Sequence, residues 1–303
     1  KLTSIASMAF RECRNLTGSL IIPEGVVEIQ QGAFTGCSSF NGTLSLPSTL
    51  KYIGITSSSD LSDNEDNDYS HGVFYECSFV CELVIPENVE VIRGFAFSQC
   101  KGLYGELRLP AGLKKLGACA FGGCANLTGS ITIPQGIVVI PEGCFEDCSF
   151  KGNLQLHDGI ISIGNRAFKG NPLKGELVLP QSLTVLANEV FNGCDFSGEL
   201  KLPKGLVRIG NNAFGSYWNG SNWRLMGVLE IPEGVVSIGE GAFYNCWGLE
   251  GVIFPEGLES IRNEAFYQCY GIGSVVSKSS IPPYIMGNAF DGVAKDNFTL
   301  EVP

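Results

Sequence analysis

The chain has 303 residues and a formal net charge of −11, because 31 acidic residues outnumber 20 Lys and Arg. This balance argues against nucleic acid as a partner, since binding to phosphates requires clustered Lys and Arg. No apolar run approaches the roughly 20 residues that a membrane-spanning helix needs. The first residues carry no signal-peptide pattern and begin inside a motif seen later, so we expect any export signal or anchor to lie outside this chain.

A repeat of 23 or 24 residues runs along the chain. Its pattern is G-x-L-x-[IL]-P-x-x-[VL]-x-x-I-G-x-x-A-F-x-x-C-x-x-L, and fixed-period self-similarity of this kind is typical of repeat architectures. Two spacings between successive repeat phenylalanines are longer, at 40 and 29 residues, and indicate insertions. The repeat phenylalanines are Phe10, Phe34, Phe74, Phe97, Phe121, Phe145, Phe168, Phe191, Phe214, Phe243, Phe266 and Phe290.

Each copy predicts a short strand followed by a short helical turn. The Leu and Ile of G-x-L-x-[IL] alternate with other residues, as in a strand with one buried face. Proline then ends the strand because it cannot donate a hydrogen bond, and His157 takes this place once. In A-F-x-x-C, the Phe and Cys stand three residues apart, which fits one side of a helical turn.

One coil of this kind cannot bury its apolar side alone, but stacked coils bury it against each other. The sequence therefore predicts an α/β repeat solenoid, a rod or arc of about 12 coils with short parallel strands and short helical turns. We expect residues 1–303 to form a single domain of this kind.

The repeat resembles that of the BspA-like leucine-rich repeat proteins, the Treponema pallidum type. The segments 231–238 and 239–246 are almost unaltered copies of that pattern. The tail is similar to the terminal cap of gut-bacterial members, which implies a C-terminal cap at about 272–303. The resemblance also implies a bacterial protein that is extracellular or on the cell surface and that adheres to host proteins or other bacteria.

Nine of the 12 cysteines lie three residues after a repeat phenylalanine. In the other three copies Asn171, Tyr217 and Val293 stand there, and none of them could replace a disulfide partner. We therefore expect a ladder of buried free thiols, which behave as small apolar side chains. Disulfides and metal binding remain alternatives, the former among Cys77, Cys81, Cys100 and Cys119.

The sequence carries no recognisable catalytic arrangement. Its two histidines are His157, at a repeat proline position, and His71, in an acidic insertion. A nucleophile–His–acid triad would depend on one of them, and no P-loop, dinucleotide-binding, zinc-protease or nucleophile-elbow motif occurs. We therefore expect no enzymatic activity and no cofactor.

The first insertion, at about residues 55–71, is rich in Asp, Ser and Asn. Such a composition cannot build a packed core, so a solvated loop is expected. A calcium loop is the alternative, because Asp66, Asp68 and Ser70 place oxygen ligands at alternate positions. The EF-hand pattern is not met, since His71 stands where that pattern has Gly.

The second insertion, at about residues 216–226, holds Tyr217, Trp218 and Trp223, and Trp247 follows one coil later. These aromatic side chains either fold back over the edge of the coils or contact a protein or a glycan. Trp and Tyr suit the second role because they offer a large contact area at low entropic cost.

Residues two and four positions before each repeat proline point outward from the predicted strands, and most are polar or β-branched. Repeat proteins commonly bind along such a sheet. The candidate binding residues on this face are Glu106, Arg108, Thr132, Asn153, Gln155, Glu176, Glu199 and Lys201.

These observations favour a non-enzymatic recognition or adhesion scaffold, at the cell surface or secreted, that binds host or bacterial surface proteins through its sheet face. A surface glycan-binding protein that uses the aromatic residues of the second insertion and Trp247 is the alternative. A structural spacer is a third possibility.

Overall fold

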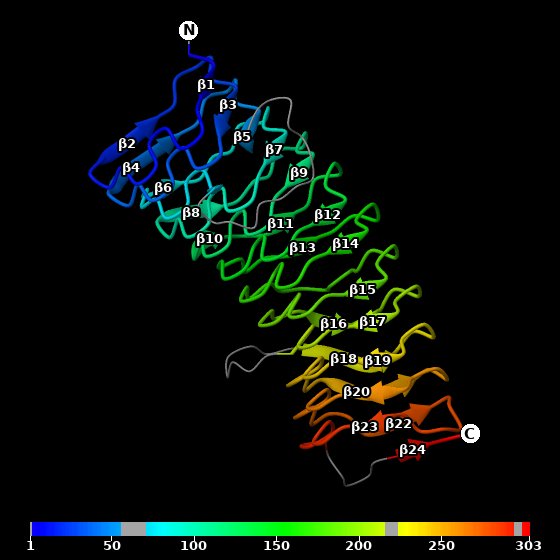
Figure 1. Ribbon diagram of the computed structural model, residues 1–303. Coiled ribbons are helices and arrows are strands. Elements are labelled where there is room, and N and C mark those ends of the chain that lie inside the picture. The colour runs from blue at the N-terminus through cyan, green and yellow to red at the C-terminus, as the bar shows by residue number, and fades with distance from the viewer. Residues whose placement is uncertain (1, 56–70, 216–223, 294–298) are drawn as a thin grey trace. The chain divides into compact units, whose positions relative to one another are not determined.

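The computed structural model describes residues 2–55, 71–215, 224–293 and 299–303. The chain forms two compact units, Lys1–Phe150 and Lys151–Pro303. In each unit the chain winds as a parallel solenoid with the leucine-rich repeat fold, and the described residues make about 11 turns in all. The short parallel strands that the sequence predicts are present in both units (Figure 1). The expected division into one domain of residues 1–303 stays a prediction.

Unit 1 has two strands in most turns, one before and one after the repeat proline. The pre-proline strands form a pair, β2–β4, and a three-stranded sheet, β10-β8-β6; the post-proline strands form a five-stranded sheet, β1-β3-β5-β7-β9. All of these neighbours pair in parallel. The bounds are β1 Ser4–Ile5, β2 Gly18–Ile21, β3 Glu28–Gln30, β4 Phe40–Ser45, β5 Tyr52–Ile55, β6 Cys81–Glu82, β7 Val91–Ile92, β8 Leu103–Glu106, β9 Lys115–Leu116, β10 Asn126–Thr128, β11 Ile131–Thr132 and β12 Val139–Ile140.

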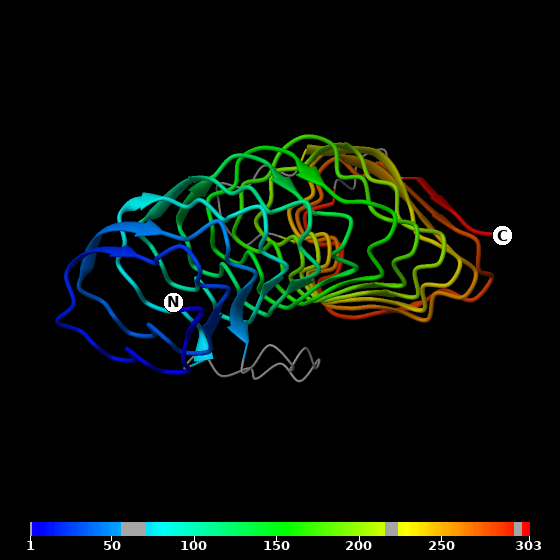
Figure 2. The ribbon, with the colours of Figure 1, turned by 90° about the horizontal axis from the view of Figure 1, so that it is seen from above.

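Unit 2 repeats this plan with two five-stranded parallel sheets, β16-β18-β20-β22-β24 before the proline and β15-β17-β19-β21-β23 after it. Successive turns of its yellow-to-red part follow nearly the same path in Figure 2. The bounds are β13 Leu154–Gln155, β14 Ser162–Ile163, β15 Val185–Leu186, β16 Ser197–Glu199, β17 Arg208–Ile209, β18 Arg224–Glu230, β19 Ser237–Ile238, β20 Leu249–Phe254, β21 Ser260–Ile261, β22 Ser274–Ser277, β23 Tyr284–Ile285 and β24 Thr299–Glu301.

Two boundaries differ from the expectation or extend it. Residues 224–226, which we expected within the second insertion, are the first residues of β18. In the expected cap, β22 pairs with β20 and β24 pairs with β22, so the parallel ladder continues into residues 272–303. The first insertion, apart from Ile55 and His71, lies outside the described residues.

The predicted helical turns are wrong, because the described residues contain strands and turns but no helix. Around Phe97, alternate backbone N–H groups bond to the next coil, as the N–H of Phe97 does to the carbonyl of Ala120 at 2.8 Å. The N–H groups between them bond three residues back, as that of Cys100 does to Phe97 at 3.1 Å. Left-handed backbone at Phe95 (φ 55°) and Gln99 (φ 60°) permits this alternation and prevents a helix.

The repeat phenylalanines form a stacked spine in each unit. Ring centroids of neighbouring coils lie 5.1 to 5.8 Å apart within unit 1 and 5.2 to 5.7 Å apart within unit 2. From Phe34 to Phe266 every repeat phenylalanine is buried, whereas Phe10 in the first coil is 42% exposed. The spine places each coil in register with the next.

The expected ladder of thiols lies beside this spine, and all 12 cysteines are free. A ladder thiol donates to the carbonyl oxygen of the repeat phenylalanine one coil earlier, at 3.0 Å from Cys124 Sγ to Phe97 and 3.0 Å from Cys37 Sγ to Phe10. Burial raises the pKa of Cys124 to about 12 and that of Cys37 to about 11. The thiols therefore stay protonated and serve as packing groups.

Candidate functional site

We call the outward side of the pre-proline strands the strand face. In unit 1 this face carries Glu106 at the end of β8, Arg108 two residues later and Thr132 on β11, and all three are exposed. Alternation along an extended chain explains their direction, because the residues between them point into the core: Leu107 is 4% exposed. The structure thus brings these three predicted residues onto one surface of unit 1.

Glu106 and Arg108 form an ion pair, with 3.2 Å between Oε2 and the guanidinium nitrogen Nη2. Their side chains are 49% and 84% exposed, so water screens the pair and it contributes little to stability. Such a pair can separate at little cost when a partner offers its own charged groups. The arrangement therefore leaves one anionic and one cationic group available for recognition.

A groove of about 390 Å³ opens beside this ion pair. The buried side chains of Leu107 and Ile133 contribute apolar surface, and Glu106, Arg108 and Thr132 contribute polar groups. The remaining lining residues are Leu109, Ala111, Ser130, Pro134 and Gln135. An apolar floor with polar groups around it is the usual composition of a binding site.

The strand face of unit 2 carries the other five predicted residues, and all five are exposed: Asn153, Gln155, Glu176, Glu199 and Lys201. Glu199 on β16 and Lys201 form a second exposed ion pair, 3.4 Å apart. Glu199 is paired in register with Met226 of β18, whose side chain is 55% exposed. Charged and apolar groups therefore alternate on this face as they do in unit 1.

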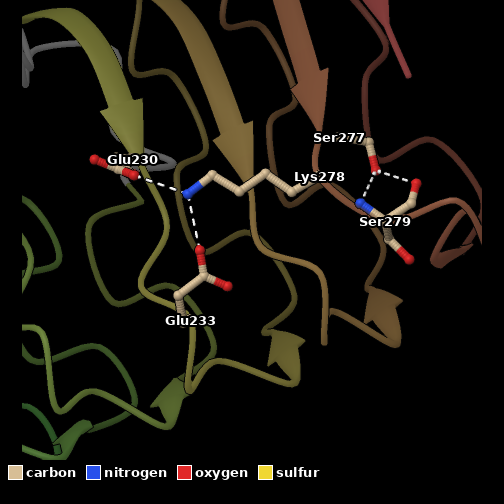
Figure 3. Close-up of polar contacts among 5 residues, drawn as sticks. All are labelled: Glu230, Glu233, Ser277, Lys278 and Ser279. Atoms are coloured by element: carbon tan, nitrogen blue, oxygen red, sulfur yellow. Dashed lines mark hydrogen bonds and ion pairs between the residues drawn. The ribbon is translucent and has the colours of Figure 1, made fainter. Parts of the chain in front are cut away.

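Lys278, which was not among the predicted residues, links two turns of unit 2 across the turn between them (Figure 3). Lys278 directly follows β22, and its Nζ lies 3.0 Å from Glu230 and 2.8 Å from Glu233. The hydrogen bond from Lys278 holds the pKa of Glu233 below its usual range. Because Ser277 is paired in register with Phe254, Lys278 occupies the position that Pro255 has in the preceding coil. Aligning the two coils in the sequence would have identified Lys278 as a residue of this position.

Exposed apolar residues accompany the charged ones on the strand face. Tyr104 on β8 is 49% exposed and Val84 is 66% exposed in unit 1, and Val228 is 45% exposed in unit 2. Tyr104 was not among the predicted residues, which lie only two and four positions before the proline. Tyr104 lies six before Pro110 and shares their alternation.

The remaining predicted residues do not lie on this face or are not described. Trp247 follows Cys246 in a turn segment and is 45% exposed. Tyr217, Trp218 and Trp223, and the calcium candidates Asp66, Asp68 and Ser70, lie outside the described residues.

Within the described residues no group of three or more His, Cys, Asp or Glu side chains could hold a metal ion. His157 is half-buried, and its Nδ1 accepts the backbone N–H of Gly159 at 3.1 Å. In that same part of the chain no helix has the length and apolarity to cross a bilayer.

The repeat that builds these surfaces matches a known family model, the BspA type leucine rich repeat region, in six copies over residues 1–64, 67–197 and 175–292. The chain belongs to this family. The sequence-based resemblance to BspA-like proteins is thereby confirmed. No curated protein matches the chain.

One solved structure supports the leucine-rich repeat fold, and two others are similar to a smaller degree. A leucine-rich repeat protein from Bacteroides ovatus is 25% identical, with a TM-score of 0.60 over 99% of this chain and 82% of that one. The Treponema pallidum leucine-rich repeat protein is 26% identical over 56% of this chain and 70% of its own, with a TM-score of 0.41. A leucine-rich cell surface protein from Faecalibacterium prausnitzii is 20% identical over 92% of this chain and 84% of its own, with a TM-score of 0.41.

Proposed function

We propose that this BspA-type protein is a non-enzymatic recognition scaffold, extracellular or on the surface of a bacterium, that binds proteins of host or bacterial surfaces through its strand face. The observation that carries the proposal is the groove of about 390 Å³ in unit 1, with Glu106, Arg108 and Thr132 on its lining. The adhesion associated with BspA-like proteins supports the same assignment.

The chemistry of the strand face suits a protein partner. Protein interfaces combine an apolar centre with polar groups that set orientation, and Arg and Tyr are enriched at the residues that contribute most binding energy. Arg108 and Tyr104 lie on the strand face of unit 1. Arg108 also lines the groove, whose apolar floor is formed by residues of two neighbouring coils. A purely structural spacer would not need such a groove, so the presence of the groove favours the recognition scaffold over the spacer.

The test is a binding screen of the intact chain against extracellular-matrix proteins and mucosal glycans. For a protein that binds, the triple variant Glu106→Ala, Arg108→Ala and Thr132→Ala removes the three predicted polar side chains of the groove. We expect it to weaken binding by at least tenfold, about 1.4 kcal/mol, because a few residues near the centre of an interface carry most of its binding energy.

A matched control is the double variant Glu87→Ala and Lys101→Ala, which removes one acidic and one basic side chain, both exposed, from other positions of unit 1. We expect the control to bind as the unaltered protein does. Equal losses in both variants, or binding unchanged by the triple variant, would place the binding surface elsewhere. A chain that binds none of the proteins or glycans would favour the spacer.

A further inference from the structure

Two neighbouring coils of unit 2 present four aromatic side chains on their turn segments, away from the strand face. Tyr244 and Tyr267 each follow a repeat phenylalanine by one residue, and Trp247 and Tyr270 each follow one by four. We call these four residues the aromatic platform. We propose that the aromatic platform binds a neutral oligosaccharide through its exposed Trp247 and Tyr270 rings, a site independent of protein binding at the strand face.

The platform is built from the repeat itself. The rings of Phe243 and Phe266 stack with centroids 5.2 Å apart. Because neighbouring coils keep this spacing, the side chains that follow these two phenylalanines also lie next to each other. The rings of Tyr244 and Tyr267 stack 5.0 Å apart at 17°, whereas those of Trp247 and Tyr270 are 6.5 Å apart and inclined by 51°. The first pair is half-buried, whereas Trp247 and Tyr270 are 45% and 52% exposed.

Hydrogen bonds to Asn245 fix the orientation of Trp247. Its indole Nε1–H donates to Oδ1 of Asn245 at 3.4 Å, and its backbone N–H donates to the carbonyl of Asn245 at 3.0 Å. Asn245 is buried, and its own N–H donates to the carbonyl of Tyr267 in the next coil at 2.9 Å. The ring is therefore oriented before a ligand arrives, which lowers the entropic cost of binding.

Close packing of the coils requires glycine directly after each exposed aromatic residue of the platform. Gly248 and Gly271 directly follow Trp247 and Tyr270. A Cβ at Gly248 would lie 2.3 Å from the carbonyl oxygen of Leu225, and one at Gly271 would lie 2.4 Å from that of Trp247, so the backbone of the coils leaves no room for a side chain. Trp247 and Tyr270 consequently have no side chain immediately after them in the sequence to cover their rings.

Polar groups border the platform. Burial, Tyr267 and the nearby Glu264 carboxylate raise the pKa of Tyr244, in that order of effect, so this phenol stays protonated. Glu264 also accepts a hydrogen bond from Nδ2 of Asn288 at 3.3 Å. A carboxylate therefore lies close to the half-buried tyrosines of the platform.

These features select a sugar over other ligands. The electronegative face of an aromatic ring attracts the polarised C–H groups of a pyranose, and its hydroxyl groups pair with carboxylates and phenols. Two rings offer at most a few hundred Å², which suits a short saccharide, whereas a stable protein interface needs about 800 Å² from each partner. The Glu264 carboxylate, which lies close to Tyr244, repels acidic sugars, so the ligand is a neutral one.

The experiment titrates the intact chain with maltohexaose, cellohexaose and mannohexaose, and with hexagalacturonate as the acidic comparison, by isothermal calorimetry. We expect at least one neutral hexaose to bind and hexagalacturonate not to bind. Trp247→Ala and Tyr270→Ala should each weaken the neutral ligand by about tenfold or more, because each removes one stacking ring.

Tyr284→Ala, which removes an exposed aromatic side chain from β23, is the matched control and should bind the hexaoses normally. Tyr270→Phe keeps the ring and should bind within about threefold of the unaltered protein. Unchanged urea-unfolding midpoints establish that the variants are folded. Absence of binding to all three neutral hexaoses, stronger binding of hexagalacturonate, or binding unaffected by Trp247→Ala and Tyr270→Ala would each overturn the proposal, and none of these results bears on the strand face.

Discussion

At the scale of single residues, the ladder thiols make the stability of the fold depend on pH. Burial raises the pKa of Cys124 from 9.0 to about 12, and it does the same for Cys269. Below pH 9 both the folded and the unfolded chain keep these protons, so the contribution to stability is complete. Between pH 9 and 12 only the unfolded chain releases them, and the free energy of unfolding falls as pH rises.

The change Cys124→Val tests this dependence, since the sequence itself places Val293 at the same repeat position. Each buried thiol should lower the free energy of unfolding by about 1.4 kcal/mol per pH unit above pH 9. We measure the free energy of unfolding with urea at pH 8, 9, 10 and 11. Plotted against pH, it should fall less steeply in the variant, by the amount that corresponds to about one proton. An identical dependence of the free energy of unfolding on pH in the two proteins would contradict a buried, protonated Cys124. As a control, alkylation of the denatured, unreduced chain shows whether any thiols are oxidised.

At the scale of elements, the turn segment after each post-proline strand depends on left-handed backbone. Gly193 lies two residues after Phe191 with φ 79°, and a Cβ there would meet only ordinary contacts, 3.5 Å from the backbone of Gly170. Adding a side chain at Gly193 therefore introduces backbone strain without a collision. Gly205 has open space around it and no left-handed backbone, so the same change there carries no such strain.

We expect Gly193→Ala to lower the free energy of unfolding by about 1–2 kcal/mol, the cost of left-handed backbone for a residue with a Cβ. Gly205→Ala should raise it by about 0.4–1 kcal/mol, because Ala reduces the freedom of the unfolded chain. Both changes in the free energy of unfolding are measured by urea unfolding, and the dependence on urea concentration (the m-value) should be the same in both variants. A loss at Gly205 as large as that at Gly193 would show that the turn geometry is not the cause.

The same segment shows where the sequence stops being informative. The spacing of Phe97 and Cys100 predicts their shared side correctly, since both are buried in the core, but it is equally compatible with a helix and with a chain of turns. The choice depends on the hydrogen bond from Phe97 to Ala120, in the next coil, and a local pattern does not encode that partner. The post-proline strands were missed for a similar reason, since most have two residues and exist only through pairing.

The candidate site divides in the same way. Alternation before the proline was sufficient to place Glu106 and Arg108 on the exposed face, where the structure has them. The groove beside them requires two neighbouring coils and could not be read from either one. Tyr270 was also missed, although it shares with Trp247 the position four residues after a repeat phenylalanine. Comparing equivalent positions between coils, instead of along one strand, would have found it.

At the scale of the whole molecule, stability in such a repeat protein comes from contacts between neighbouring coils. Phe191 in unit 2 illustrates this, since its fully buried ring stacks 5.7 Å from both Phe168 and Phe214 and meets Phe196 edge-on at 5.8 Å. Deleting the ring leaves a cavity in contact with three side chains of the same unit. The effect should therefore spread first through unit 2.

We expect Phe191→Ala to cost about 3–5 kcal/mol locally, as for other buried aromatic side chains. Amide hydrogen exchange should show the loss of protection within Lys151–Pro303, while the amides of Lys1–Phe150 keep theirs. Phe121→Ala in unit 1, whose ring is also fully buried and stacked 5.4 Å and 5.8 Å from its neighbours, should show the reverse pattern. Equal losses in both units with either variant would mean that all 303 residues unfold as one cooperative block, the behaviour expected of a single domain.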